Sequence, residues 1–146
     1  WTIGIISKSG GMMSETARLL TREGLGQSTA ICIGGDKLIG TDIKDCLELF
    51  AKDDETKAIV LFGEIGGTYE ELAAEYIKET NFSKPIIAFI SGQFAERWKN
   101  VPLGHAGAII QAGKGTRSAK VSSLEEAGVK VVDVHHEIVN AVKDSI

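Results

Sequence analysis

The sequence is poor in the features that mark several large classes of protein. Its formal net charge is −4 over 146 residues, so it has no general attraction for nucleic acid or for an anionic membrane surface. No apolar run approaches the roughly 20 residues of a membrane-spanning helix. The two cysteines, Cys32 and Cys46, lack metal or redox spacing and are expected to be reduced core residues of a cytosolic type of protein.

Aromatic residues are also scarce, at 6% of the chain. A flavin site would need aromatic side chains in its loops, and only Phe94 and Trp98 occupy suitable positions. The Walker A spacing, GxxxxGKS or GxxxxGKT, is absent, so no P-loop is expected. Proline occurs twice and glycine 17 times, and the placement of the glycines is the informative part of this composition.

Short apolar runs alternate with amphipathic segments along the whole chain. Strands are expected over 2–7, 28–34, 57–63, 85–91 and 129–134, and helices over 10–24, 41–52, 68–79, 116–128 and 135–146. The strands are continuously apolar, which is typical of a parallel sheet with helices on both faces. We therefore predict a single α/β domain over 1–146, with a flavodoxin-like, doubly wound, parallel five-stranded sheet in the order 2-1-3-4-5.

Two of the expected helices have apolar residues at helical spacing. In 41–52, which Thr41 or Asp42 would cap, the apolar face consists of Ile43, Cys46, Leu47 and Phe50. In 68–79 it consists of Tyr69, Leu72, Ala73 and Tyr76. Near the start of the last helix, His135 and His136 are expected to be surface or capping residues.

The loops that follow the strands should contain the chemistry, because ligands of this fold bind beyond the carboxyl ends of the strands. These loops read "SKSGG" (7–11), "GGDKLIG" (34–40), "GEIGG" (63–67) and "SGQFAERWKNVPLGHAGAIIQAGKG" (91–115). Every glycine pair in the chain lies in one of them. The "AGKG" segment (112–115) precedes a predicted helix and is either a source of backbone N–H groups or a flexible connection.

The "SKSGG" loop runs from the first strand into the first helix. Its small residues expose backbone N–H groups at a helix N-terminus, where an anion is favoured, and Lys8 would add positive charge. We identify Ser7, Lys8, Ser9 and Gly10 as candidate phosphate-binding residues. The alternative is an ordinary β–α turn in which Ser9 only caps the helix.

His105 is the candidate nucleophile, because a neutral imidazole can attack a phosphoryl group and form a covalent intermediate. Its neighbours Gly104 and Gly107 would let the backbone approach a tetrahedral anion, which makes them further candidate phosphate-binding residues. Glu64 follows the third strand and would face the same crevice, where a carboxylate can fix the tautomer of the imidazole. A loop histidine with a purely structural role is the alternative, and no metal site is expected.

Several segments together resemble one known family. In order, "GIISKSG", "GLGQS", "CIGGD", "GTD", "DCLELF", "GEIGG" and "GHAGAII" resemble the carboxy-terminal domain of the alpha subunit of succinyl-CoA synthetase. The segment "SKSGGMMSE", together with "EIGGTYEE", resembles the related ATP-citrate lyase more closely. The similarity covers almost the whole chain. It implies a flavodoxin-like domain in which His105 is phosphorylated during turnover, Glu64 contacts that histidine, and Ser7 to Gly10 help to hold the phosphate.

The resemblance also implies partners. Coenzyme A would bind to an upstream Rossmann domain absent from this chain, and ATP or GTP with Mg²⁺ to an ATP-grasp beta subunit or fused domain. The chain is thus expected to be a fragment, inactive alone, of a nucleotide-dependent acid–CoA ligase that forms a hetero-oligomer in the cytoplasm or mitochondrial matrix. No cofactor is expected to be tightly bound here.

The segment before the histidine departs from the family pattern. It reads "SGQFAERWKNVPLGHAG", without the usual pair of prolines, so the organic acid stays open: succinate, malate, citrate or another. The alternative enzyme is an ATP-citrate lyase or citryl-CoA synthetase, which uses the same module. A non-enzymatic alternative is a flavodoxin-like receiver, but Glu64 stands where a receiver would have its phosphorylated aspartate, and Asp36 follows the second strand instead.

Overall fold

The computed structural model describes residues 1–97, 104–110 and 115–146. Its five strands are β1 (Ile3–Ser7), β2 (Gln27–Cys32), β3 (Ala58–Glu64), β4 (Ile86–Ser91) and β5 (Lys130–Val132). Its helices are α1 (Gly10–Arg22), α2 (Ile43–Ala51), α3 (Tyr69–Thr80), α4 (Arg117–Glu126) and α5 (Ile138–Lys143), with short 3₁₀ turns at Gln93–Arg97 and His135–Glu137. The predicted role of Trp98, and residues 112–114 of the "AGKG" segment, lie outside the described residues.

The strands form one sheet in the order β2-β1-β3-β4-β5, and every pair of neighbours is parallel. This confirms the predicted fold class and strand order. The winding reverses between β1 and β3, so the loops after these two strands lie side by side at the carboxyl edge of the sheet.

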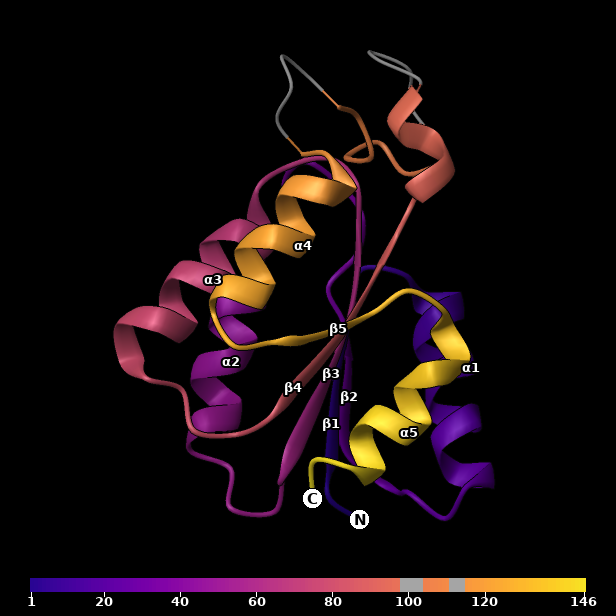
Figure 1. Cartoon of the computed structure of the whole chain (residues 1–146), viewed down its shortest axis with the longest axis vertical. Coiled ribbons are helices and arrows are strands. Elements are labelled where there is room, and N and C mark those ends of the chain that lie inside the picture. The colour runs from indigo at the N-terminus through magenta and orange to yellow at the C-terminus, as the bar shows by residue number, and fades with distance from the viewer. Residues whose placement is uncertain (98–103, 111–114) are drawn as a thin grey trace.

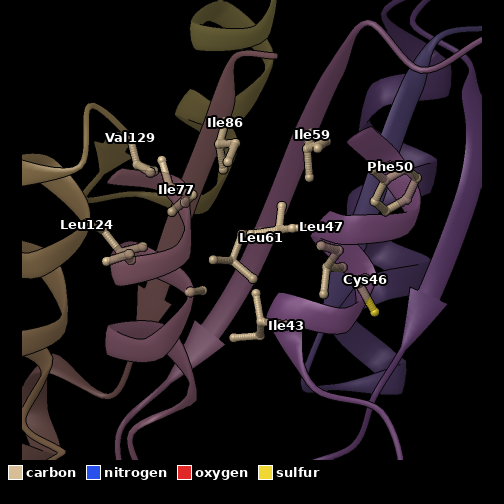
Figure 2. Close-up of a cluster of buried hydrophobic side chains, with 14 of the residues drawn as sticks. Ile43, Cys46, Leu47, Phe50, Ile59, Leu61, Ile77, Ile86, Leu124 and Val129 are labelled. Carbon is tan, nitrogen blue, oxygen red and sulfur yellow. The ribbon is translucent and has the colours of Figure 1, made fainter. Parts of the chain in front are cut away.

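Helices cover both faces of the sheet (Figure 1), and each face has its own apolar core. On one face, α2, α3 and α4 pack against side chains such as Leu61 and Ile86, and Figure 2 shows this cluster. On the other face, α1 and α5 pack against side chains such as Ile5 and Val60. Residues of β3 alternate between the two clusters, which is why its sequence is apolar at successive positions.

Helix α2 follows its sequence pattern closely. All four residues of its predicted apolar face, Ile43, Cys46, Leu47 and Phe50, are buried (Figure 2). Asp42 is the N-cap, and it exchanges hydrogen bonds with Asp45 in a capping box. The ring of Phe50 lies directly over Gly4 of β1, where a Cβ atom would come within 2.7 Å of it.

Helix α3 turns a different face to the core from the one predicted. Its buried residues are Glu70, Ala73, Ala74 and Ile77, whereas Leu72 is 44% exposed and Tyr69 and Tyr76 are only partly buried. The predicted helical spacing is confirmed, but the buried face lies one residue later along the helix than the predicted apolar face. The cause is Glu70, a carboxylate that is buried because it has charged partners, as described below.

Two further expectations are corrected. Cys32 is exposed rather than part of the core, because β2 is an edge strand covered less than the others; Cys46 is buried as expected. His135 is partly buried rather than a simple surface residue: its Nε2 lies 2.8 Å from Thr16 Oγ1, and its ring packs edge-on against Phe62 and Phe89. Burial lowers the pKa of His135 below its ordinary value, against an opposing effect of Glu15.

Candidate active site

Loops from four parts of the chain meet at the carboxyl edge of the sheet. Gly107 donates its backbone N–H to the carbonyl of Gly35 at 2.9 Å, and Gly66 donates to the carbonyl of Gly115 at 2.8 Å. The segment 104–110 is also anchored by apolar contacts, since Ala108 and Ile110 are buried in a small cluster with Ile65. These contacts hold the backbone on either side of the predicted site in place.

The structure brings Glu64 and His105 together. The Nδ1 atom of His105 lies 2.8 Å from Oε2 and 3.0 Å from Oε1 of Glu64. The Glu64 side chain is 10% exposed, whereas that of His105 is 42% exposed. The carboxylate thus holds the ring from the protein side through Nδ1, which leaves Nε2 as the nitrogen without this partner.

Glycine makes this contact possible. A Cβ atom at Gly35 would lie 2.0 Å from His105 Nδ1 and 2.6 Å from Glu64 Oε1, so any side chain there would occupy the contact itself. At Gly66, whose φ is +86°, a Cβ atom would lie 2.1 Å from the carbonyl oxygen of Gly107. At Gly66 the loops approach one another backbone to backbone, whereas at Gly35 the backbone lies against two side chains, and both positions lack room for a Cβ atom.

The predicted phosphate loop is an ordered helix start. Ser7 donates its hydroxyl to the carbonyl of Ser9 at 2.7 Å and accepts the N–H of Ser9 at 3.1 Å. Ser9 is the N-cap of α1 and accepts the N–H of Met12, so both hydroxyls have local partners. The N–H groups of Gly10 and Gly11, at the first two positions of α1, have no acceptor within the helix and are the donors that this loop offers.

Lys8 is buried, with 3% of its side chain exposed. Its Nζ lies 3.3 Å from Glu70 Oε1 and 4.0 Å from Glu64 Oε1, so carboxylates surround this ammonium group. Lys8 also lines a pocket of about 280 Å³ whose other lining residues include Asp36, Lys37, Gly67 and Gly107. Gly104 has a φ of +90° with open space beside it, whereas the N–H of Gly107 is taken by Gly35.

Sequence reasoning missed two buried charged residues beneath this site. Glu70 in α3 and Lys120 in α4 are both fully buried, and they form an ion pair with each other. No sequence signal singles out Glu70, because the series 70, 73, 74 and 77 has the same helical spacing as the predicted apolar series 69, 72, 73 and 76. A Cβ atom at Gly63 would lie 2.9 Å from Glu70 Oε1, so the glycine leaves room for this carboxylate.

Two classes of site are not found in the part of the chain that the structure describes. No group of three or more histidine, cysteine or acidic side chains there is arranged to hold a metal ion. Within the same ranges, no helix has the length and apolar character needed to cross a membrane.

The fold and this geometry define a doubly wound α/β domain with a carboxylate-held histidine at the carboxyl edge of its sheet. Residues 6–132 match the CoA-ligase family, and the chain belongs to that family. It is 50% identical, over 143 residues, to the alpha subunit of an ADP-forming succinate–CoA ligase from Staphylococcus epidermidis. That match covers 98% of this chain and 46% of the relative, so the chain spans about half the length of the curated relatives it matches. The predicted carboxy-terminal position within such a subunit is not confirmed by this coverage.

Solved structures agree with this assignment. An ATP citrate lyase from Methanosaeta concilii, in complex with (3S)-citryl-CoA, aligns with a TM-score of 0.88 at 31% identity, over 97% of this chain and 24% of that one. A Francisella response regulator receiver domain aligns with a TM-score of 0.57 at 11% identity, over 98% of this chain and 93% of that one. The second likeness shows the flavodoxin-like fold alone.

Proposed function

We propose that this chain is a phosphohistidine domain of a nucleotide-dependent acid–CoA ligase, and that His105 relays a phosphoryl group from a nucleoside triphosphate to a carboxylate. The observation that carries the proposal is the contact between Glu64 and Nδ1 of His105 in a chain of the CoA-ligase family. The resemblance of the "GEIGG" and "GHAGA" segments supports the same two residues.

We propose different roles for the two ring nitrogens of His105. A carboxylate that accepts a hydrogen bond from Nδ1 favours the tautomer with its proton on that atom, which leaves a lone pair on Nε2 for attack on phosphorus. Glu64 then faces the nitrogen remote from the phosphoryl group, so its negative charge stabilises the imidazolium without lying against the dianion. Nε2 is therefore the proposed phosphorylated atom.

The proposed sequence of bonds follows from these roles. Nε2 attacks the terminal phosphorus, and the bond from that phosphorus to the leaving nucleoside diphosphate breaks. An oxygen of the carboxylate substrate then attacks the same phosphorus, the N–P bond breaks, and an acyl phosphate forms. The thiol of coenzyme A attacks the acyl carbon, loses its proton, and releases inorganic phosphate as the thioester forms.

Residues of this chain would hold the phosphoryl group during these steps. The N–H groups at the start of α1, with the N-terminal dipole of that helix, are the proposed donors, and Ser7, Ser9 and Gly10 shape the loop that presents them. Gly104 leaves room beside the histidine. Lys8 contributes positive charge from its buried position beneath the loop. Because its ammonium group already contacts carboxylates, direct binding of the phosphate is a secondary role for it.

The other substrates would be bound elsewhere. We propose that 1–146 is one domain of a larger assembly, in which a Rossmann domain binds coenzyme A and an ATP-grasp partner binds ATP or GTP with Mg²⁺. The isolated domain should therefore not complete the reaction. Succinate is the acid named for the Staphylococcus epidermidis relative, and citrate is the acid named for the structural neighbour, so both are candidate substrates.

The test is intact-mass measurement of the full-length parent protein with its nucleotide-binding partner, Mg²⁺, and ATP or GTP. We expect the chain to gain one acid-labile phosphoryl group, and a His105→Asn variant to gain none. Loss of the phosphoryl group on addition of succinate and coenzyme A would support the ligase. Loss of the phosphoryl group on addition of citrate and coenzyme A would support the lyase or citryl-CoA synthetase. A folded complex that gains no phosphoryl group with either nucleotide would overturn the proposal.

A further inference from the structure

A chain of buried charges connects α4, α3 and the start of α1 to the histidine. Lys120 pairs with Glu70, Glu70 pairs with Lys8, and Lys8 lies 4.0 Å from Glu64, which contacts His105. Lys120, Glu70 and Lys8 are each no more than 3% exposed. Ion pairs this deeply buried are costly to desolvate and are weak contributors to stability, which suggests another reason for their presence.

Lys120 is fully satisfied where it stands. An ammonium group has three donors, and those of Lys120 reach Glu70 Oε2, Glu71 Oε2 at 2.9 Å and the carbonyl of Gly67 at 3.1 Å. Lys120 therefore fixes the carboxylate of Glu70 and, through Gly67, the loop that follows β3. It has no donor left for the site itself.

Glu70 divides its two oxygens between two tasks. Its Oε2 binds Lys120, while its Oε1 accepts the backbone N–H of Glu64 at 3.1 Å and lies 3.3 Å from Lys8 Nζ. Glu70 thus holds the backbone from which the Glu64 side chain extends. It also provides the nearest countercharge for Lys8, which is nearer to Glu70 than to Glu64.

We propose that Glu70 is a positioning residue for the proposed phosphoryl transfer: by binding Lys8, it keeps the Glu64 carboxylate free to hold Nδ1 of His105. The described residues offer Lys8 two carboxylates, Glu70 and Glu64. If the charge of Glu70 is removed, the buried ammonium of Lys8 turns to Glu64 and draws it from the histidine. Glu70 touches neither the imidazole nor the phosphoryl group, so its effect passes through Lys8 and Glu64.

This inference rests on the proposed function but is tested separately from it. The variant is Glu70→Gln in the full-length protein, because the amide oxygen of glutamine can still accept the N–H of Glu64 while its charge is gone. The first readout is the tautomer of His105, taken from the ¹⁵N chemical shifts of its two ring nitrogens at high pH. We expect the parent protein to show the proton on Nδ1, and Glu70→Gln to show a shift towards the Nε2–H form.

Two further variants separate this role from a general loss of structure. Glu71→Gln removes a carboxylate from the same turn of α3 that contacts Lys120 but has no contact with Lys8 or Glu64, so it should leave the tautomer unchanged. Adding Lys8→Met to Glu70→Gln removes the competing ammonium and should restore the Nδ1–H form. A merely structural role predicts that the second substitution adds to the damage.

The second readout is the rate at which His105 gains a phosphoryl group in the complete complex. We expect Glu70→Gln to slow it about 10- to 100-fold, as when the outer partner of a metal-binding histidine is lost. If the parent protein gains no phosphoryl group, the proposed function fails while the ¹⁵N shifts still decide the role of Glu70. A parent-like tautomer in folded Glu70→Gln, or no restoration in the double variant, would overturn the inference. If Glu70→Gln does not fold, the inference is tested with Lys8→Met alone. Loss of the Nδ1–H form of His105 in that variant would overturn the inference, because Lys8 would then support Glu64 rather than compete for it.

Discussion

A methyl group at position 35 should disconnect the histidine from its carboxylate while leaving the fold intact. Gly35 does not have a positive φ, so alanine can adopt its backbone conformation without strain. Its Cβ atom, however, would lie 2.0 Å from Nδ1 and 2.4 Å from Cγ of His105. Gly35→Ala therefore acts on the contact between His105 and Glu64 through steric exclusion alone.

The size of the displacement follows from these distances. Real Cβ atoms essentially never come closer than 3.0 Å to such a neighbour, so the imidazole must move by at least about 1 Å. A misplacement of about 1 Å can cost about 100-fold in the rate of a reaction that depends on alignment. We expect a loss of that order in the phosphorylation of His105 in the complete complex.

The assay compares Gly35→Ala with Gly40→Ala, a change in the same loop where the new Cβ atom would meet nothing within 4 Å. Phosphoryl uptake is measured by quenched-flow intact mass, and unfolding is followed in urea. Both variants should unfold at nearly the same urea concentration as the parent, because the side chain of His105 is 42% exposed and contributes little to the core. Parent-like uptake by Gly35→Ala, with the Nδ1–H tautomer retained, would refute the steric reasoning.

Two other predictions concern stability. Gly4→Ala should lower the free energy of unfolding by about 1–3 kcal/mol in urea titrations, because its Cβ atom would come within 2.7 Å of the Phe50 ring. Adding Phe50→Leu should recover part of this loss. Losses that simply add in the double variant would contradict this account. Burial lowers the pKa of His135, so the folded chain binds fewer protons than the unfolded chain, and stability should fall as the pH drops below about 6.5, by at most about 1.4 kcal/mol per pH unit. His135→Gln should flatten this slope between pH 5 and 7, and an unchanged slope in that variant would count against the burial of His135 as its cause.

The strand order and the layers of the fold could be predicted because they depend on the repeat of apolar residues along the chain rather than on contacts between particular side chains. Continuous apolar strands and short connections specify a parallel sheet, and the four apolar residues of α2 fall where the helical repeat requires. The predictions that failed depend on tertiary neighbours. Cys32 is apolar in pattern but lies on an edge strand, and His135 is polar in pattern but lies against two aromatic rings.

The site was predictable where loops and charges point to one edge of the sheet. Glu64 and His105 both follow from that topology, and the structure places them in contact. Glu70 and Lys120 did not follow, because a charged residue in an amphipathic helix normally faces solvent. Their burial becomes reasonable only once each has the other as a partner, and no local pattern links residues 50 positions apart.

The glycines at 35 and 66 have a consequence for how such a domain can change over generations. Gly66 meets the backbone of Gly107 directly, and Gly35 lies against the contact between Glu64 and His105, so neither position has room for a side chain. Side chains elsewhere around the crevice can then vary without a compensating change at Gly35 or Gly66. In a library that randomises the loop positions other than Glu64 and His105, tolerated diversity should be low at these two glycines and higher at the side chains that line the crevice.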